Sequence, residues 1–281
     1  MRVRYSVTDH SDSKKYKYLL LLPLLLSILF LTAQQKATYS LKCSLPTDAA
    51  LFTTDKLQNT YIATSTNQLL RYDSECQERF QYNNYTLGNL QSIDVSNPLN
   101  IILFYPEFQS IIVLDRTLNF SGEVNLLDLG LINVSCIGSA VDNNIWVYDD
   151  AAFSLKKISQ GGTIITSSND LSLELPTPPS PIQLIARENS VYLNDPKVGI
   201  LMFNQFGQYQ KTIPITHIES FQVIGEQLIF QQDQKLFSYD PKALKANPIP
   251  LPEQNSSAIQ WQVQKNRLYL LDDTALHIYR F

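Results

Sequence analysis

Acidic and aromatic side chains recur in this sequence at one kind of place, the short polar stretch that follows an apolar run. After Ile101–Phe104 the chain reads Tyr105-Pro106-Glu107-Phe108, and after Ile145–Val147 it reads Tyr148-Asp149-Asp150. Carboxylates gathered from several such stretches would attract a cation, an amine or a basic protein patch. The candidate binding residues are Tyr105, Glu107, Phe108, Asp149, Asp150, Asp195, Asp233, Asp272 and Asp273.

Residues of the common catalytic arrangements are sparse. After position 33 the chain has two histidines, His217 and His277, and it contains no Gly-x-Ser-x-Gly or His-x-His pattern. A Ser–His–Asp triad is recognised by geometry, so the sequence alone does not decide that case. Neither Gly-x-x-x-x-Gly-Lys nor Gly-x-Gly-x-x-Gly occurs, and a nucleotide is therefore not indicated. We predict no catalytic residue, no metal ligand and no cofactor.

The three cysteines, Cys43, Cys76 and Cys136, lie far apart in sequence, and their spacings match no zinc motif. In an exported protein one pair could be oxidised, leaving one thiol over. Cys136 lies in the apolar run Val134–Ile137 and is typical of a small buried hydrophobic residue. Between these alternatives we favour no disulfide.

An apolar segment recurs along the chain with a period of about 40 residues, a length typical of structural repeats. The large residues at its third position are Tyr61, Ile102, Trp146, Tyr192, Ile229 and Tyr269, with spacings of 41, 44, 46, 37 and 40. Each is followed by a second apolar anchor, at Tyr72, Leu114, Ile158, Phe203, Tyr239 and Tyr279. The next residue is usually a turn former, whose side chain could cap the following bend.

A period of this length with several short strands is the signature of a β-propeller blade. The apolar residues alternate with a period of two, which disfavours helix. The second unit contains four expected strands, at Gln91–Val95, Ile101–Phe104, Ile111–Leu114 and Gly122–Leu126. The sequence therefore predicts an all-β fold, a six-bladed β-propeller.

The two ends of the chain predict how the ring closes. The sixth unit stops at Phe281 after its third strand, whereas Lys36–Leu45 forms a spare strand before the first inner strand. We expect Ala37–Cys43 to complete the last blade, so that no long sheet edge stays open. The candidate binding residues then lie in the loops between second and third strands, which ring one mouth of the central channel.

Both sets of polar residues also have a purely structural interpretation. Turns favour Asp for backbone reasons, which alone would scatter carboxylates over these loops. The inner strands supply mostly amides, which suit a polar channel better than a calcium cage, and we favour hydrogen bonding between blades as their role. These inner-strand residues are Gln91, Asp94, Gln183, Gln222, Gln260 and Gln262.

The segment 1–33 has the layout of a secretory signal peptide. Lys14, Lys15 and Lys17 precede the apolar run Leu19–Thr32, and Leu31-Thr32-Ala33 offers small-residue cleavage. The apolar run is short for a membrane span, which needs about 20 residues. We expect a signal peptide at 1–33, a single propeller at 34–281, and a periplasmic or secreted protein; an uncleaved membrane anchor is the alternative.

Cleavage would remove five basic and two acidic residues, so the net charge of −4 becomes −4 − 3 = −7. An acidic surface argues against nucleic acid or anionic lipid as a partner. We expect a monomer whose partner is an unknown protein or polar ligand.

The segments Thr54–Ile62 and Asp142–Val147 resemble the inner hairpin of NHL-type six-bladed propellers, and Leu70–Asp73 is similar to the end of an NHL third strand. The turn glycine usual in NHL repeats is mostly Asn, Gln or Lys here. The resemblance extends over most of the chain after position 33 and is strongest to exported bacterial propellers. It implies the fold and a location in the cell envelope.

Two functions compete on these grounds. The first is an exported, non-enzymatic propeller that acts as a protein- or ligand-binding scaffold in the bacterial cell envelope. The second is a calcium-dependent hydrolase or lyase, similar to propeller lactonases, which hold calcium in the channel with Asp, Asn and Glu from inner strands. We favour the first, because the inner strands here carry amides where those enzymes carry carboxylates.

Overall fold

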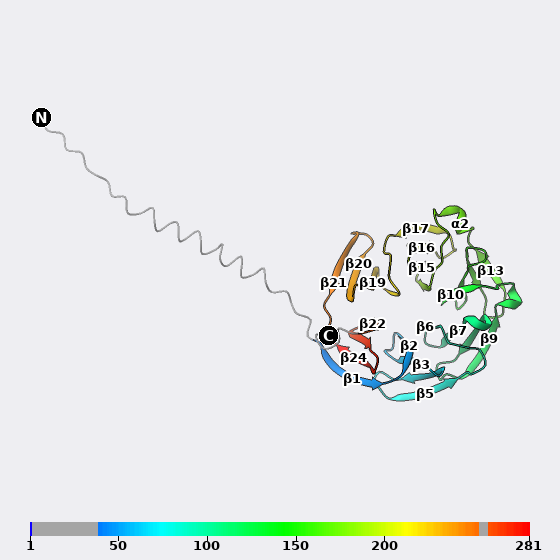
Figure 1. The fold of residues 1–281 in the computed structure, drawn as a ribbon, viewed down its shortest axis with the longest axis horizontal. Helices are drawn as coiled ribbons and strands as arrows, with labels where there is room; N and C mark the ends of the chain where they lie inside the picture. The colour runs from blue at the N-terminus through cyan, green and yellow to red at the C-terminus, as the bar shows by residue number, and fades with distance from the viewer. Residues whose placement is uncertain (2–38, 253–257) are drawn as a thin grey trace. The chain divides into compact units, whose positions relative to one another are not determined.

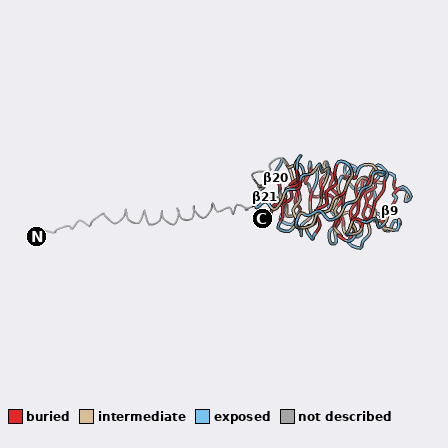
Figure 2. Tube along the Cα trace, turned by 90° about the horizontal axis from the view of Figure 1, so that it is seen from below, coloured by how far each residue is buried: buried red, intermediate tan, exposed pale blue. Residues whose placement is uncertain are grey.

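The computed structural model describes residues 39–252 and 258–281, together with Met1. Tyr39–Phe281 forms one compact unit. The expected signal peptide lies outside the described residues and stays a prediction. In the part of the chain that is described, no helix is long and apolar enough to cross a membrane. Buried residues occupy the interior of the sheets, and exposed residues lie toward the edges of the unit (Figure 2).

Six antiparallel sheets of four strands each are arranged around a central axis, as Figure 1 shows, which confirms the six-bladed propeller. Blade one contains β2 (Ala49–Thr54), β3 (Thr60–Thr64), β4 (Gln68–Tyr72) and β5 (Glu78–Asn83). Blade two contains β6 (Ser92–Asn97), β7 (Asn100–Tyr105), β8 (Ser110–Leu114) and β9 (Phe120–Asn125). Blade three contains β10 (Val134–Ser139), β11 (Ile145–Asp149), β12 (Ser154–Ile158) and β13 (Ile164–Ser167).

Blade four contains β14 (Gln183–Arg187), β15 (Ser190–Asp195), β16 (Gly199–Asn204) and β17 (Tyr209–Ile213). Blade five contains β18 (Phe221–Ile224), β19 (Gln227–Gln232), β20 (Lys235–Asp240) and β21 (Lys245–Ile249). Blade six contains β22 (Gln260–Gln264), β23 (Arg267–Leu271), β24 (Ala275–Arg280) and β1 (Ser40–Pro46). Short helices η1 (Pro106–Phe108), η2 (Leu127–Leu129) and α2 (Leu171–Glu174) interrupt the loops.

The repeated apolar segments are the second strands of the six blades. Second strands are flanked on both faces by neighbouring blades, so β3, β11 and β23 are buried along their whole length, and β7 is buried after its first residue. The first anchors are buried except for Tyr192, which is half-buried, and the second anchors lie in the third strands. The period read from the sequence therefore reports the packing between blades.

The ring closes as the chain ends predicted. β1 pairs antiparallel with β24, from Ser40 opposite Arg280 to Pro46 opposite Ala275. The closing strand begins later than expected, because we placed it at Ala37–Cys43 and the structure has it at Ser40–Pro46. Ala37 and Thr38 lie outside the described residues.

Several turns between third and fourth strands share one geometry, and the residue after the second anchor caps them as expected. In blade two the Asp115 carboxylate accepts the N–H groups of Thr117 and Asn119. Bonds from the Thr117 hydroxyl and these N–H groups lower the pKa of Asp115 to about 2. The fourth turn residue is left-handed, at Cys76, Leu118, Gly162 and Gly207. Blades one and two thus lack the glycine that favours this conformation.

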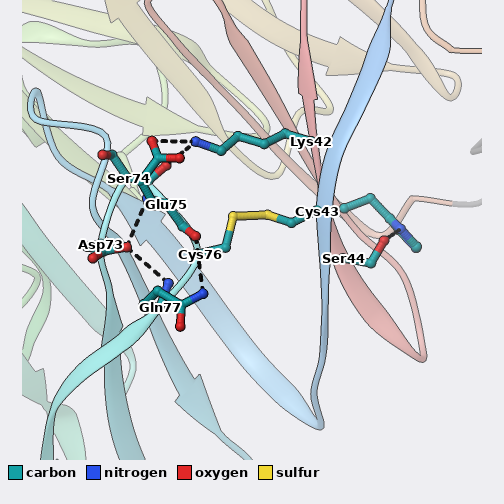
Figure 3. The surroundings of a disulfide bond; sticks show 9 residues. Lys42, Cys43, Ser44, Asp73, Ser74, Glu75, Cys76 and Gln77 are labelled. Atoms are coloured by element: carbon teal, nitrogen blue, oxygen red, sulfur yellow. Dashed lines mark hydrogen bonds and ion pairs between the residues drawn. A yellow bond between two sulfur atoms is a disulfide. The ribbon is translucent and has the colours of Figure 1, made fainter.

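The expectation that no cysteines pair is wrong, because Cys43 and Cys76 form a disulfide (Figure 3). Cys43 lies in β1, and Cys76 lies in the turn between β4 and β5 of blade one. Lys42 strengthens the same junction by donating to the Ser74 carbonyl and pairing with Glu75 at 2.8 Å. Sequence spacing could not reveal this pair, since only the closed ring brings β1 beside blade one. Cys136 is free and buried, as predicted.

Successive strands of a blade run in opposite directions, so successive turns lie alternately at its two ends. We call the end with the turns between strands one and two and between strands three and four the hairpin face. The other end, with the loops between strands two and three and the connections between blades, is the loop face. The nine candidate binding residues belong to the loop face.

Candidate functional site

The central channel holds two cavities that share several lining residues, among them Thr53, Gln91, Gln183 and Gln262. The cavity toward the hairpin face has a volume of about 490 Å³, and the cavity toward the loop face has a volume of about 560 Å³. The first is lined by two cations and two carboxylates, Lys56, Arg187, Asp55 and Asp94, whereas His217, Glu219 and Asp233 line the second. The channel is therefore polar, with different charges at its two ends.

Four inner-strand glutamines bridge neighbouring blades, which confirms the structural interpretation for Gln183, Gln222, Gln260 and Gln262. Gln91 instead lines both cavities and forms no such bond within the described residues. Gln183 in β14 exchanges two hydrogen bonds with the backbone of Phe221 in β18, at 3.0 and 3.2 Å. Gln222 accepts the N–H of Val263 at 2.7 Å. The amide of Gln260 donates to the Ala50 carbonyl at 3.0 Å. These amides hold the blades at their inner edges and are only in part available to a ligand.

Calcium needs six to eight converging oxygen ligands, and the inner strands do not supply them. Asp94 already accepts the N–H groups of Ser96 and Ser139, one on each oxygen, at 2.8 and 2.7 Å. In the described residues no group of three or more His, Cys, Asp or Glu side chains converges on one point. The donors present do not fit a calcium cage of the lactonase type.

The loop-end cavity is the best candidate for a binding site. Its lining is rich in amides from two adjacent blades, including Gln231, Gln232 and Gln234 of blade five and Gln260 of blade six. Gln232 donates to the Thr216 carbonyl at 3.2 Å, which leaves its own side-chain carbonyl to accept a hydrogen bond from a ligand. The remaining lining includes the buried ring of Trp261.

Two exposed carboxylates, Glu219 and Asp233, stand at this cavity. Neither forms an ion pair with another residue in the described ranges. His217 lies on the same connection as Glu219, and its Nδ1 is 3.0 Å from the Thr216 hydroxyl. The cavity can thus offer negative charge, amide carbonyls and one imidazole to a polar guest.

Most of the predicted binding residues instead hold their own loops together. Asp149 is buried, pairs with Lys156 at 2.6 Å and accepts the N–H of Ala151. Asp195 is also buried and accepts three N–H groups, from Ser180, Lys197 and Val198. These contacts are those expected of Asp in turns.

The surroundings of Asp150 favour its protonated form, whereas those of Asp272 favour its charged form. Burial raises the pKa of Asp150, and the nearby Asp149 adds to that effect against a hydrogen bond from Ser135. Burial also acts to raise the pKa of Asp272, but the net shift is downward, because Thr274, Ala275 and His277 all donate to its carboxylate. Asp272 therefore stabilises its loop in the charged form.

The other candidates are placed in three ways. Tyr105 is buried at the end of β7, and Glu107 accepts the backbone and side-chain N–H groups of Asn89 at 3.1 Å. Phe108 and Asp273 are exposed at the loop face. Of the nine residues, only Asp233 lines either channel cavity.

Sequence reasoning missed Glu219, Gln231, Gln232 and Gln234 as cavity residues, although it included Asp233. Glu219 lies in a connection between blades, whereas the candidates predicted from the sequence all lie in the loops between second and third strands or at the strand ends beside them. The signal available was the density of glutamines in Gln227–Gln234, where half of the positions are Gln. Such a cluster in a loop-face segment is unusual for a turn, where Gly, Asn and Asp dominate.

No protein-family model and no curated protein sequence matches the chain. Among solved structures, the chain is similar to a streptogramin B lyase at 13% identity and a TM-score of 0.58, covering 86% of this chain and 87% of that one. It is similar to the Neurospora crassa Pan2 WD40 domain at 11% identity and a TM-score of 0.62, covering 86% and 95%. For the Staphylococcus aureus virginiamycin B lyase the values are 14%, 0.56, 82% and 79%.

These likenesses establish the class of protein, a six-bladed β-propeller, and no more. Propellers support many unrelated activities, so function has to be argued from the site.

Proposed function

We propose that the protein is an exported, non-enzymatic binding scaffold of the cell envelope, whose loop-end cavity takes a cationic group of a protein or polar ligand. The observation that carries the proposal is the pair Glu219 and Asp233 at the mouth of a cavity of about 560 Å³. Both carboxylates are exposed and lack a cationic partner among the described residues. Unpaired carboxylates beside amide carbonyls suit an ammonium or guanidinium group, which brings only donors.

Two features support export. The segment 1–33 has the composition of a signal peptide, with basic residues before an apolar run. The disulfide between Cys43 and Cys76 is of a kind that persists in oxidising compartments such as the periplasm. Cell fractionation, with mass measurement of the mature N-terminus, tests this part of the proposal. A full-length chain recovered from the cytoplasm with free thiols would contradict it.

The binding proposal is tested with a tri-lysine peptide as probe, by isothermal titration calorimetry. Binding is expected at about 20 mM salt and strong weakening at about 200 mM, because exposed charges are screened over shorter distances at higher salt. The double variant Glu219→Gln/Asp233→Asn should lose about tenfold in affinity, roughly 1.4 kcal/mol. Each substitution keeps the shape of the side chain.

The matched control is Glu188→Gln, which removes an exposed carboxylate from the hairpin face. It should leave the affinity for the peptide unchanged. An equal loss in the control would show that the peptide responds to net charge alone, and the cavity would then not be the site. Absence of binding at low salt would reject a cationic ligand.

A lyase-like activity is the second candidate, and one observation favours it. His217 and Glu219 face the same cavity, so a base and a carboxylate that could orient it are near one another. Two of the similar structures are lyases, one of them described as a streptogramin B lyase. Incubation with a streptogramin B, followed by chromatography, tests whether the compound is consumed, and His217→Ala should abolish any such loss.

The calcium-dependent form of this candidate has a separate test. A ligand that binds only the folded protein raises its melting temperature. Since most of the amides and Asp94 of the inner strands are engaged between blades, calcium at about 1 mM should leave the melting temperature unchanged. A rise of several degrees would instead reveal a calcium site and support a metal-assisted enzyme.

A further inference from the structure

The hairpin face carries exposed apolar side chains in its turns or at the strand ends beside them. Turn tips ordinarily hold Gly, Pro, Asn, Asp or Ser. Here Leu57, Leu99, Val141, Phe206, Ile224 and Leu244 are between 41% and 74% exposed. They are distributed over blades one to five, and the exposed Phe281 continues the series in blade six. The hairpin face thus exposes at least one large apolar side chain from every blade.

The topology places these tips on the same side of the molecule. Leu57, Leu99 and Val141 lie in turns between first and second strands, near the channel. Phe206 and Leu244 lie in turns between third and fourth strands, farther out. The apolar tips therefore form a broad, discontinuous array and not one compact patch.

Charged side chains distinguish the two faces, whereas apolar exposure alone does not, since Phe108, Ile132 and Leu173 are exposed on the loop face. Exposed acids dominate the loop face, including Glu107, Asp128, Glu174, Glu219, Asp233 and Asp273. Exposed cations stand among the apolar tips of the hairpin face, including Lys56, Arg116, Arg187 and Lys265. The expectation from net charge that anionic lipid is an unfavourable partner therefore applies to the loop face only, because an anionic surface would attract the hairpin face.

Exposed acids also occur on the hairpin face, but most of them are neutralised by lysines. Glu75 pairs with Lys42, and Asp142 pairs with Lys157 at 3.0 Å. Lys242 likewise pairs with Glu226 at 2.7 Å. Glu78 and Glu188 have no ion pair in the described ranges, but the unpaired exposed cations of this face outnumber them.

The chain enters the propeller at the hairpin face. β1 runs antiparallel to β24, which ends at this face, so Ser40 and the preceding Tyr39 lie here. Only positions 33–38 separate the apolar run Leu19–Thr32 from Tyr39. The part of the chain that precedes Tyr39 therefore joins the propeller at its hairpin face.

We propose that the hairpin face docks on the surface of a lipid bilayer. The apolar tips enter the boundary between headgroups and acyl chains, while Lys56, Arg116, Arg187 and Lys265 contact lipid phosphates. A protein partner would require a continuous, closely packed apolar centre, which scattered tips do not supply. A fluid bilayer accommodates separate tips. The loop face then points to water, and this inference does not depend on what binds there.

The test places a fluorescent label on one face at a time, in the full chain reconstituted with vesicles. Cys43 and Cys76 are paired and Cys136 is buried, so a single introduced cysteine can be labelled selectively. The vesicles contain phosphatidylethanolamine, phosphatidylglycerol and a nitroxide-labelled lipid that quenches nearby fluorophores. Val141→Cys and Phe206→Cys report on the hairpin face, and Phe108→Cys and Ile132→Cys are matched exposed controls on the loop face.

Hairpin-face labels should lose at least about twice as much emission as loop-face labels, because quenching requires contact with lipid. Equal quenching on both faces, or none on either, would overturn the proposal. A change in the emission of hairpin-face labels on adding unlabelled protein without vesicles would also overturn it. A second copy of the chain would then cover the face.

A further variant separates docking from mere tethering by the N-terminal segment. Leu57→Ser/Val141→Ser/Phe206→Ser, labelled at Leu244→Cys, should reduce quenching severalfold. Phe108→Ser/Ile132→Ser/Leu173→Ser, with the same label, should leave it unchanged. All six residues are exposed, so both variants should keep the melting temperature of the parent. Unchanged quenching in the first variant would show that the tips do not touch lipid.

Discussion

Blades three and six have the same four-stranded sheet, but the chain builds them differently. Blade three is one continuous segment from Val134 to Ser167, in which every strand follows its neighbour. Blade six joins the two ends of the chain, with β1 outermost beside β24. Ser44 and His277, which are neighbours there at 2.8 Å, are 233 residues apart in sequence.

The difference matters because a long loop must close before the last blade can form. Closing it costs chain entropy that blade three does not lose, and long-range pairing slows folding. The structure compensates at the N-terminal side. The disulfide and the contacts of Lys42 hold β1 against blade one, so β24 pairs with a strand that is already positioned. Blade three, whose Cys136 is a free thiol, relies on apolar packing instead.

Truncation of Trp146 in blade three should have the largest effect. Its ring is buried against Gly207 of blade four, and Lys157 lies over it at 4.8 Å. Trp146→Ala should lower the free energy of unfolding by about 3 to 5 kcal/mol. Tyr269→Ala at the matching position of blade six should cost a similar amount if the split blade packs equally well. Urea denaturation compares them, and a much smaller loss at Tyr269 would show that blade six is loosely packed.

Loss of the disulfide should come next. The sequence separation of 33 residues corresponds to about 3 to 4 kcal/mol in the chain-entropy account. Cys43→Ala/Cys76→Ala should lower the free energy of unfolding by about that amount, and reductant should destabilise the wild type but not the variant. If reductant leaves the wild-type denaturation midpoint unchanged, the strand pairing with β24 alone holds β1.

The sequence repeat that predicted blade three also predicted blade six, because both blades bury a large residue at the same position of the second strand. Trp146 and Tyr269 align in sequence and are both buried second-strand residues. The spare strand at the start predicted the closure, although its bounds shifted toward the C-terminus. The disulfide was beyond reach, since its two cysteines come together only through the three-dimensional path of the ring.

Glutamine bridges should contribute less than either of these features. Gln262 in blade six exchanges hydrogen bonds with Thr54 and Thr53 of blade one at 3.0 and 3.2 Å, across the boundary next to the closure. Gln183 bridges blades four and five, where the chain is continuous. Substitution by alanine at either position should lower the free energy of unfolding by about 1 to 2 kcal/mol. Thermal denaturation compares the two variants. A clearly larger loss of stability in Gln262→Ala would show that the closure depends on polar bridges.

The binding residues were less predictable than the fold. Apolar anchors are forced by packing, whereas an Asp in a loop can cap its own turn or face a ligand with the same local sequence. Asp195 and Asp233 occupy corresponding loops, and only the structure shows that the first is saturated by N–H groups and the second faces a cavity.

The smallest effects should come from two carboxylates in matching loops, Asp272 of blade six and Asp150 of blade three. The pKa of Asp272 is lowered in the folded protein, so its charge stabilises the fold above the ordinary pKa near 4. That contribution is lost as the pH falls below 4. The pKa of Asp150 is raised, so its charge opposes folding at neutral pH, and stability recovers as the pH falls toward 4.

Asn substitutions at these positions should therefore act in opposite directions. Asp272→Asn should lower the melting temperature at pH 7, and Asp150→Asn should raise it, each by less than about 4 °C for a chain of this size. At a pH well below 4 the Asp150 difference should disappear, because that carboxyl is then neutral in both states. The Asp272 difference should only shrink over this range, because its lowered pKa keeps the carboxylate charged in the folded protein after it is neutral in the unfolded chain. Melting curves between pH 3 and pH 7 measure this. The same sign at both positions would mean that loop strain, and not charge, distinguishes the split blade from the continuous one.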